Sequence, residues 1–116
     1  MYREVYAARS RLHGPRHVET LQDASNLSDQ LVTTQLWAEA KQFLSEQIPI
    51  FQDVNGLDDK LTLKMRWRYA IVLEYEGKRT EAVAILEDVE RRYRRVLGDS
   101  HPLTAKIQSV LEATRN

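Results

Sequence analysis

A spaced pattern of glycine, a polar residue and threonine occurs three times along the chain, and it limits the fold more than any other feature of the sequence. In each copy the glycine is followed three positions later by histidine or aspartate and six positions later by threonine. Successive copies are 42 residues apart: Gly14, His17 and Thr20; Gly56, Asp59 and Thr62; Gly98, His101 and Thr104. Self-similarity at a spacing of about 20 to 50 residues is typical of stacked repeat proteins.

Between these turns the apolar residues recur at steps of three and four, which predicts helices with one buried face each. The period of two that marks strands is missing, so we expect no strand. The predicted helices span residues 2–12, 17–34, 36–53, 59–76, 79–96 and 101–114. Because the connections are short, neighbouring helices should run antiparallel and form an all-α solenoid.

The repeated turn has a local explanation in helix capping. Pro102 fits the first helical position, which makes His101 the expected N-cap, and the repeat frame assigns the same role to His17 and Asp59. Gly56 and Gly98 should then end the preceding helices in the left-handed conformation that glycine tolerates. We interpret both histidines as structural rather than as metal ligands or catalytic groups.

Two further segments indicate which helical repeat this is. The segment "EYEGKRTEAVAILEDV" resembles the turn of a tetratricopeptide repeat, and "TQLWAEAKQFL" repeats it with Gln35 in the place of Gly77. Together with "LGDSHPLT", these segments resemble the 42-residue tetratricopeptide variant of the kinesin light chains, which implies a right-handed α-α superhelix. Of the paired asparagines in that family only Asn26 is present, and Trp67 and Arg68 occupy both places in the second full repeat.

This resemblance also divides the chain, treated as one repeat domain, into units. It implies a half repeat at residues 2–12, full repeats at 17–54 and 59–96, and another half repeat at 101–114. Solenoids need polar caps on their ends. Since the chain begins and ends within a unit, we expect it to be an excerpt of a longer array.

The composition argues against several classes of function. Seventeen basic and seventeen acidic residues cancel, and cysteine is absent, so neither a nucleic-acid partner, a disulfide framework nor a thiolate metal site is expected. The run "ERRYRRV" concentrates four arginines, but nearby acidic residues can pair with them at helical spacing, which favours a solvated helix face. No phosphate loop, nucleophile motif or long apolar segment is present, so we expect a cytoplasmic protein that is not an enzyme, contacts no membrane and uses no cofactor or metal.

In tetratricopeptide arrays the first helix of each repeat lines a concave groove that binds extended peptides. The resemblance places these residues in the groove: Gln22, Ser25, Asn26, Asp29 and Thr33; Lys64, Trp67, Arg68, Ile71 and Tyr75; Lys106, Ser109, Val110 and Ala113. Trp67 and Arg68 are of the residue types that dominate binding energies at protein interfaces, so we expect their loss to weaken binding with little change in thermal stability. The alternative for Trp67 is packing against the adjacent helix.

Chaperone-binding members of the wider family hold a C-terminal carboxylate with lysine, asparagine and arginine. Lys64 and Arg68 match two of those positions, but Asp29 stands where an asparagine is needed, and its charge would repel the carboxylate. Asp29 is instead expected to pair with Lys64 or Arg68. The resemblance therefore implies a protein-interaction scaffold that binds some other peptide in its groove.

An alternative function is that of a spacer or oligomerisation element in a larger regulatory or signalling protein. The first and last helices each lack one neighbour that a longer array would supply. Their apolar residues are expected to be exposed and to join copies head to tail, which would make a homo-oligomer. These residues are Tyr2, Val5, Tyr6 and Ala8 in the first helix and Ile107, Val110 and Leu111 in the last.

Overall fold

The computed structural model describes all 116 residues, which form six α-helices and no strand. The helices are α1 (Tyr2–His13), α2 (Val18–Thr33), α3 (Trp37–Asn55), α4 (Lys60–Tyr75), α5 (Arg79–Leu97) and α6 (Pro102–Arg115). Every predicted boundary agrees with the structure within two residues. The all-α prediction is therefore confirmed.

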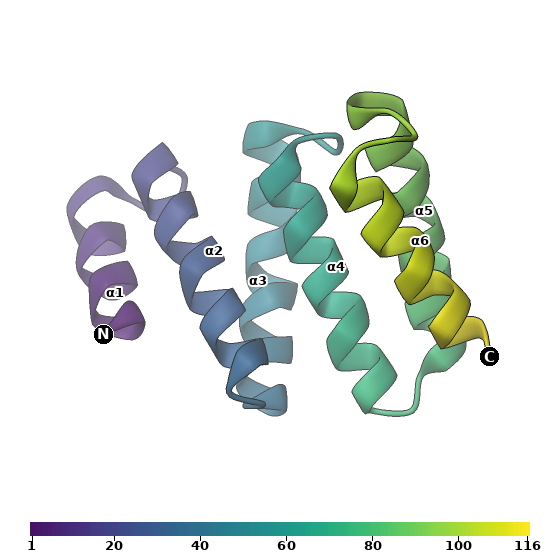
Figure 1. The fold of residues 1–116 in the computed structure, drawn as a ribbon. Coiled ribbons are helices and arrows are strands. Elements are labelled where there is room, and N and C mark those ends of the chain that lie inside the picture. The colour runs from purple at the N-terminus through teal and green to yellow at the C-terminus, as the bar shows by residue number, and fades with distance from the viewer.

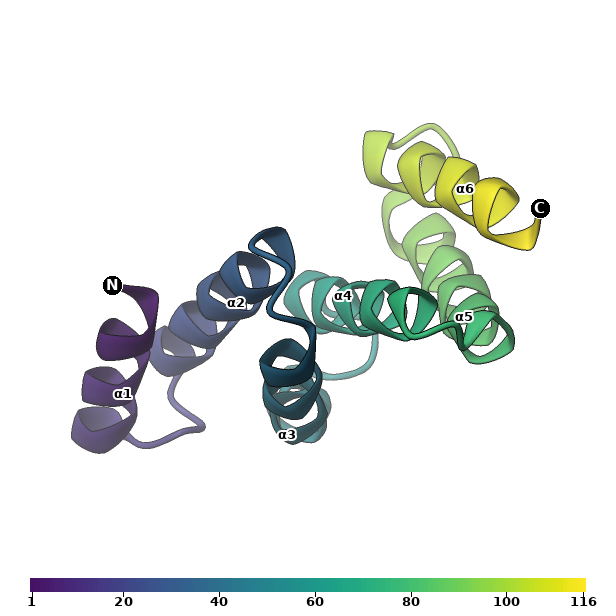
Figure 2. The same cartoon turned by 90° about the horizontal axis from the view of Figure 1, so that it is seen from below.

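The helices form a row in which each one runs antiparallel to the next and packs on it (Figure 1). The row measures 43 × 29 × 20 Å along its principal axes. Helices α2, α4 and α6 lie on one side of the row, α3 and α5 lie behind them, and α2 also packs directly on α4. Seen from below, the row bends at α5, so that α6 lies on the opposite side of α4 from α3 (Figure 2).

The repeated turns have the capping hydrogen bonds that the sequence predicts. His17 Nδ1 accepts from the backbone N–H of Glu19 at 3.2 Å, and His101 Nδ1 accepts from that of Leu103 at 3.1 Å. Asp59 Oδ2 accepts from the N–H of Leu61 at 2.9 Å in the equivalent place. These bonds satisfy backbone donors that have no partner within the first turn of each helix.

The glycines that end α3 and α5 differ in detail from the expectation. Gly56 and Gly98 have the positive φ that was predicted, 93° and 94°, but their ψ values are 164° and 162°. A left-handed helical residue has ψ near 47°. The chain therefore leaves each helix in an extended, mirror-image conformation that is open almost only to glycine.

The core consists of two groups of buried side chains that share one helix. The first group joins α2, α3 and α4, and the second joins α4, α5 and α6. Helix α4 places Met65 and Val72 in the first group and Leu63, Ala70 and Leu73 in the second. It is therefore apolar on two sides and holds the two halves together.

The tight crossings between paired helices are formed as predicted. Ala40 packs among the leucines of α2 and α3, and Ala82 packs against α4, and neither alanine has exposed surface. Helix α1, by contrast, has no buried residue. Its packing on α2 and α3 depends on partly buried groups such as Tyr6, whose ring lies 5.1 Å from that of Phe43 in an edge-on contact.

The expectation of an exposed apolar flank is correct for Tyr2, Val5 and Ala8 of α1, but it is wrong for Tyr6, which is partly buried against Phe43, and for α6. In α1, Tyr2 and Val5 expose 43% and 38% of their surface. In α6, Ile107 and Leu111 are buried against α5, at 0% and 4% exposed.

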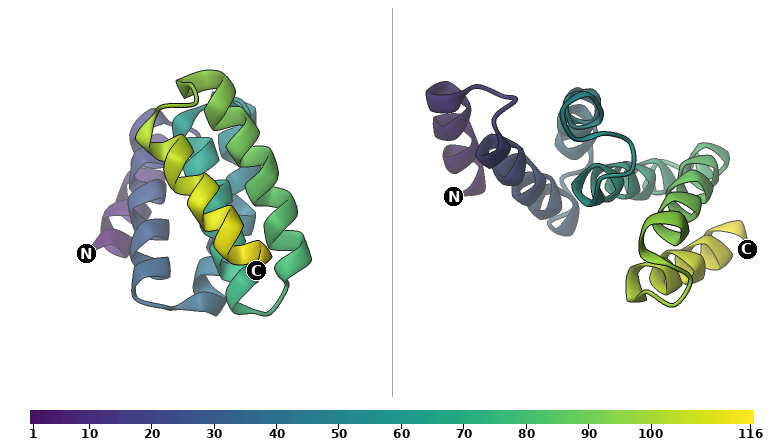
Figure 3. Two further views of the ribbon diagram at one scale, coloured as in Figure 1. Left: turned by 45° about the vertical axis from the view of Figure 1, so that its right-hand side comes forward. Right: turned by 90° about the horizontal axis from the view of Figure 1, so that it is seen from above.

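The outward positions of α6 explain this difference. They are equivalent by the repeat frame to Ala70 and Leu73, which pack on the following helix, but in α6 they are Glu112 and Arg115. Arg115 lies on the surface and reaches back to α5, where its Nη2 is 2.6 Å from Glu87 Oε2. The open side of α6, which lies across the end of the row in Figure 3, is therefore polar.

None of the six helices combines the length and the apolarity that crossing a lipid bilayer requires.

Candidate binding groove

A groove of about 490 Å³ runs across the side of the row formed by α2, α4 and α6. Its lining alternates apolar and charged side chains. The lining residues are Asp29, Val32 and Thr33 from α2, Lys64, Trp67, Arg68 and Ile71 from α4, and Leu103, Lys106 and Val110 from α6. The structure thus brings residues from three helices, far apart in sequence, to one concave surface.

Eight of these ten lining residues are among the predicted groove positions, and two are not. Val32 and Leu103 were missed, although each lies one helical turn from a predicted position on the same face, beside Asp29 and Lys106. Both are apolar, and they extend the apolar part of the groove at its two ends. The spacing of three residues within each helix was the signal that could have found them.

Other predicted positions lie outside the groove. Gln22 and Asn26 are exposed and hydrogen-bond to each other at 3.3 Å, Nε2 to Oδ1. Ser109 is exposed on α6, and Tyr75, 64% exposed, stacks on Trp37 with 4.4 Å between ring centroids. Ala113 is exposed and does not line the groove either.

Arg68 connects the groove to the core beneath it. Its Nη1 donates to the carbonyl oxygen of Ser25 at 3.1 Å, and to the hydroxyl oxygens of Ser25 and Ser28 at 3.0 Å each. Both serines are buried in α2, and the Arg68 side chain is only 16% exposed. Arg68 therefore ties α4 to α2, and its loss would affect the fold, which contradicts the expectation of a side chain available mainly for binding.

The charge of Arg68 is only weakly compensated. Burial lowers the pKa of Arg68, and the nearby carboxylate of Asp29 opposes this effect. The Arg68 Nε and Asp29 Oδ1 atoms lie 3.8 Å apart, which confirms the pairing expected for Asp29. Because the Asp29 side chain is 67% exposed, this ion pair lies at the groove surface.

Trp67 has both of the roles considered for it. It lines the groove, and it also packs edge-on against Tyr93 of α5, with ring centroids 6.0 Å apart. Tyr93 is fully buried, and its hydroxyl has no hydrogen-bond partner. Burial raises the pKa of Tyr93 to about 12, although the charge of Arg68 acts in the opposite direction.

Two lysines provide the remaining charge of the groove. Lys64 on α4 and Lys106 on α6 line it, and neither forms an ion pair within the chain. Since Asp29 is paired with Arg68, the groove carries an excess of positive charge beside apolar side chains. Its chemistry suits a ligand that has both apolar groups and carboxylates.

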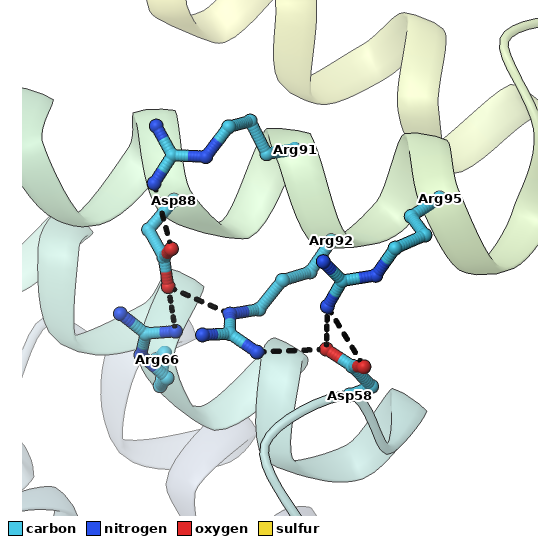
Figure 4. A network of polar contacts seen from close by, with 6 residues as sticks. All are labelled: Asp58, Arg66, Asp88, Arg91, Arg92 and Arg95. Carbon is cyan, nitrogen blue, oxygen red and sulfur yellow. Dashed lines mark hydrogen bonds and ion pairs between the residues drawn. The ribbon is translucent and has the colours of Figure 1, made fainter.

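The arginine-rich run on α5 forms a network of ion pairs on another part of the surface (Figure 4). Asp88 accepts from Arg91 and Arg92 of its own helix, as helical spacing predicts, and also from Arg66 of α4 at 2.6 Å. Asp58, in the turn before α4, accepts from Arg92 and Arg95 at 2.8 Å each. The expected pairing at helical spacing is confirmed for Arg91 and Arg92, but the face is only partly solvated, because Arg92 is 22% exposed and, with Arg95, also pairs with Asp58 of another segment.

Ionisation of the two aspartates in this network is strongly favoured. Burial alone would raise the pKa of Asp88, but the hydrogen bonds from Arg92 and Arg66 outweigh it and hold the pKa well below its usual range. Hydrogen bonds from Arg92 and Arg95 likewise lower the pKa of Asp58. The network clamps the turn before α4 onto α5, so it positions α4 and with it the groove.

The structure has no group of three or more histidine, aspartate or glutamate side chains placed to hold a metal ion.

The family model of the CATSPERZ C-terminal helical domain matches residues 79–116, which form α5 and α6. This match covers less than half of the chain, and it makes that helical pair similar to the domain. No curated protein matches the chain.

Proposed function

We propose that this protein is a non-catalytic interaction scaffold that binds an extended segment of a partner protein in the groove between α2, α4 and α6. The observation that carries the proposal is the groove itself, in which an apolar floor formed by three helices is combined with lysines that have no partner in the chain. Such apolar surface with a few polar groups is typical of ligand sites.

The dimensions of the groove suit a short extended segment. Helices α2 and α4 pack side by side, which places their axes about 8 to 10 Å apart, and α6 lies beyond α4, so crossing the groove takes at least about 20 Å. An extended chain advances about 3.3 Å per residue, which corresponds to about six residues. Successive side chains of such a segment point to opposite sides, so about three of them would face the groove.

The charges suggest the composition of that segment. Trp67 and Ile71 in the middle of the groove would contact its apolar side chains, while Lys64 and Lys106 would attract carboxylates. We infer a partner segment in which acidic and apolar residues alternate. We also propose that the helices form a right-handed superhelix of the 42-residue tetratricopeptide type and that the protein is cytoplasmic.

The experiment that tests the proposal selects peptide ligands on the protein itself. A phage-displayed library of peptides of about seven residues is selected on the 116-residue chain, and the affinity of selected peptides is measured by fluorescence anisotropy. The expected peptides contain Asp or Glu next to apolar residues. Replacement of both groove lysines, Lys64→Glu with Lys106→Glu, should weaken their binding by more than about tenfold.

The matched control is Lys60→Glu. Lys60 is an exposed lysine of the same helix that forms no ion pair and does not line the groove, so its replacement should leave the affinity unchanged. Failure to select any peptide, or selected peptides that bind the groove variant as tightly as the parent, would refute the proposal.

A further inference from the structure

Helix α1 carries an apolar stripe on the side that faces away from the rest of the protein. The α1 stripe consists of Met1, Val5, Ala8 and Leu12, and all four residues are exposed, with Met1 at 85% and Leu12 at 76%. Val5, Ala8 and Leu12 lie along one line of the helix, and Met1, the N-cap residue before it, continues the spacing of four, three and four residues. This spacing is that of the contact positions in a two-stranded coiled coil.

The repeat frame indicates that this side of the helix is made to contact another helix. The positions of α3 that are equivalent to Met1 and Val5 are Phe43 and Gln47. Both contact Tyr6 of α1, the helix two before α3 in the chain: Phe43 by the edge-on ring contact at 5.1 Å, and Gln47 by a hydrogen bond from its Nε2 to the tyrosine oxygen at 2.7 Å. Helix α1 has no such neighbour, since it lies at the end of the row (Figure 2).

The opposite end of the molecule is unsuitable as the neighbour. The outward side of α6 presents Glu112 and Arg115, and its apolar residues are already buried against α5. A head-to-tail contact would therefore place charged side chains against the α1 stripe, which is unfavourable. Of the two ends of the molecule, the one that offers a complementary apolar surface is therefore the α1 stripe of a second copy.

We propose that two copies of this protein associate through their α1 stripes, with the two α1 helices antiparallel across a two-fold axis. In this arrangement Met1 of one copy lies opposite Leu12 of the other, and Val5 lies opposite Ala8. Each layer of the contact therefore consists of two apolar residues of the stripe, one from each copy. An isologous contact of this kind closes after two copies and does not build a fibre.

Charge complementarity at the edge of the stripe determines the direction. Glu4 and Arg11 lie on the same side of the stripe, and in the antiparallel pair Glu4 of each copy lies next to Arg11 of the other. Within one chain Arg11 forms no ion pair, and Glu4 pairs only with the terminal ammonium group, 2.7 Å away. In a parallel pair Glu4 would instead lie next to Arg9 of the other copy. Arg9 already pairs within its own chain with Glu19 at 2.6 Å and with Asp23 at 2.7 Å.

The first test is the mass in solution. Sedimentation analysis of the 13.5 kDa chain at concentrations from about 1 μM to about 1 mM should show a reversible change from monomer to dimer. Leu12→Glu, which puts a carboxylate into the stripe, should raise the dissociation constant by more than about tenfold. The control is Val54→Glu on α3, because Val54 is equivalent to Leu12 in the repeat frame and is 38% exposed, the same as Val5.

The second test is a charge exchange that separates this arrangement from other contacts. Glu4→Arg alone and Arg11→Glu alone should each weaken the dimer, whereas the double variant with both changes should restore it, because each copy then presents the reversed pair. All of these residues are exposed, so circular dichroism should show the parent helix content.

Three results would overturn the proposal. They are a parent that remains monomeric at every concentration, a Leu12→Glu variant that dimerises like the parent, and single charge variants that the double variant does not rescue. The last result would be expected of a parallel pair, in which Glu4 contacts Arg9 and not Arg11.

Discussion

Replacement of Tyr93 by phenylalanine should make the protein more stable. The Tyr93 hydroxyl is buried and has no hydrogen-bond partner, while its ring packs edge-on against Trp67. A buried polar group without a partner costs about 1 to 3 kcal/mol. Phenylalanine keeps the ring and removes this cost, so we expect the free energy of unfolding at neutral pH to rise by about 1 to 2 kcal/mol.

The same substitution should also change how stability depends on pH. The pKa of Tyr93 is raised to about 12 in the folded protein, whereas an unfolded tyrosine ionises near pH 10. Between these values the unfolded state loses the proton and the folded state keeps it, so stability falls as pH rises through this window. The loss attributable to Tyr93 reaches about 3 kcal/mol above pH 12 and is absent below pH 10.

Urea unfolding of the parent and of Tyr93→Phe from pH 7 to pH 12 measures both effects, and the difference between the two proteins removes the contribution of the other tyrosines and the lysines. Tyr75→Phe is the control, because Tyr75 is 64% exposed. It should change stability by less than about 0.5 kcal/mol. If Tyr93→Phe destabilised the protein by more than about 1 kcal/mol at neutral pH, the Tyr93 hydroxyl would have a hydrogen-bond partner in the folded protein, which would refute the prediction.

Three further substitutions test other parts of the structure. Ala82→Leu should lower stability by about 1 to 3 kcal/mol in thermal or urea unfolding, because Ala82 is fully buried at the crossing of α4 and α5; unchanged melting would contradict this packing. Arg68→Ala should lower stability by about 2 kcal/mol, since it leaves the buried hydroxyls of Ser25 and Ser28 without their donor, and a neutral result would show that the serines find other partners. Gln35→Gly should raise the melting temperature by a few degrees because Gln35 has a φ of 62°, and a decrease would mean that backbone entropy outweighs the strain.

The fold was predictable because the sequence signals that specify it either act within one helical turn or recur at a fixed spacing along the chain. Capping by His17, Asp59 and His101 depends on residues within one turn, and the 42-residue spacing places equivalent turns without knowledge of any tertiary contact. The ψ angles of Gly56 and Gly98 were not predictable in the same way. A glycine after a helix signals a positive φ, but it does not distinguish the left-handed from the extended mirror conformation.

The groove was predictable as a surface, but the role of each side chain within it was not. Lys64, Trp67 and Ile71 line it as expected, because they lie on one face of α4. Arg68 lies on that face too, yet the hydroxyls that hold it belong to α2, 43 and 40 residues earlier in the chain. Only the packing distance between α2 and α4 decides whether this guanidinium faces a ligand or the core.

The apolar flank assigned to α6 was wrong because its neighbours were not considered together with its own pattern. Ile107 and Leu111 have helical spacing whether they face α5 or solvent, so the pattern alone could not decide. The polar residues at the positions equivalent to Ala70 and Leu73 did contain the answer. Comparing each helix with its counterparts in the repeat frame, rather than alone, would have shown that Glu112 and Arg115 face water.

Helix α4, which supplies side chains to both groups of core residues, determines how the protein opens. Neither half can lose α4 without exposing the apolar side chains of the other, so the backbone amides of α4 should exchange with deuterium only through global unfolding. Helix α1 buries no residue and can detach while the rest stays intact, so its amides should exchange by local opening, much faster than those of α4. Slower exchange in α1 at high protein concentration would then report occupation of its outer side by a second molecule.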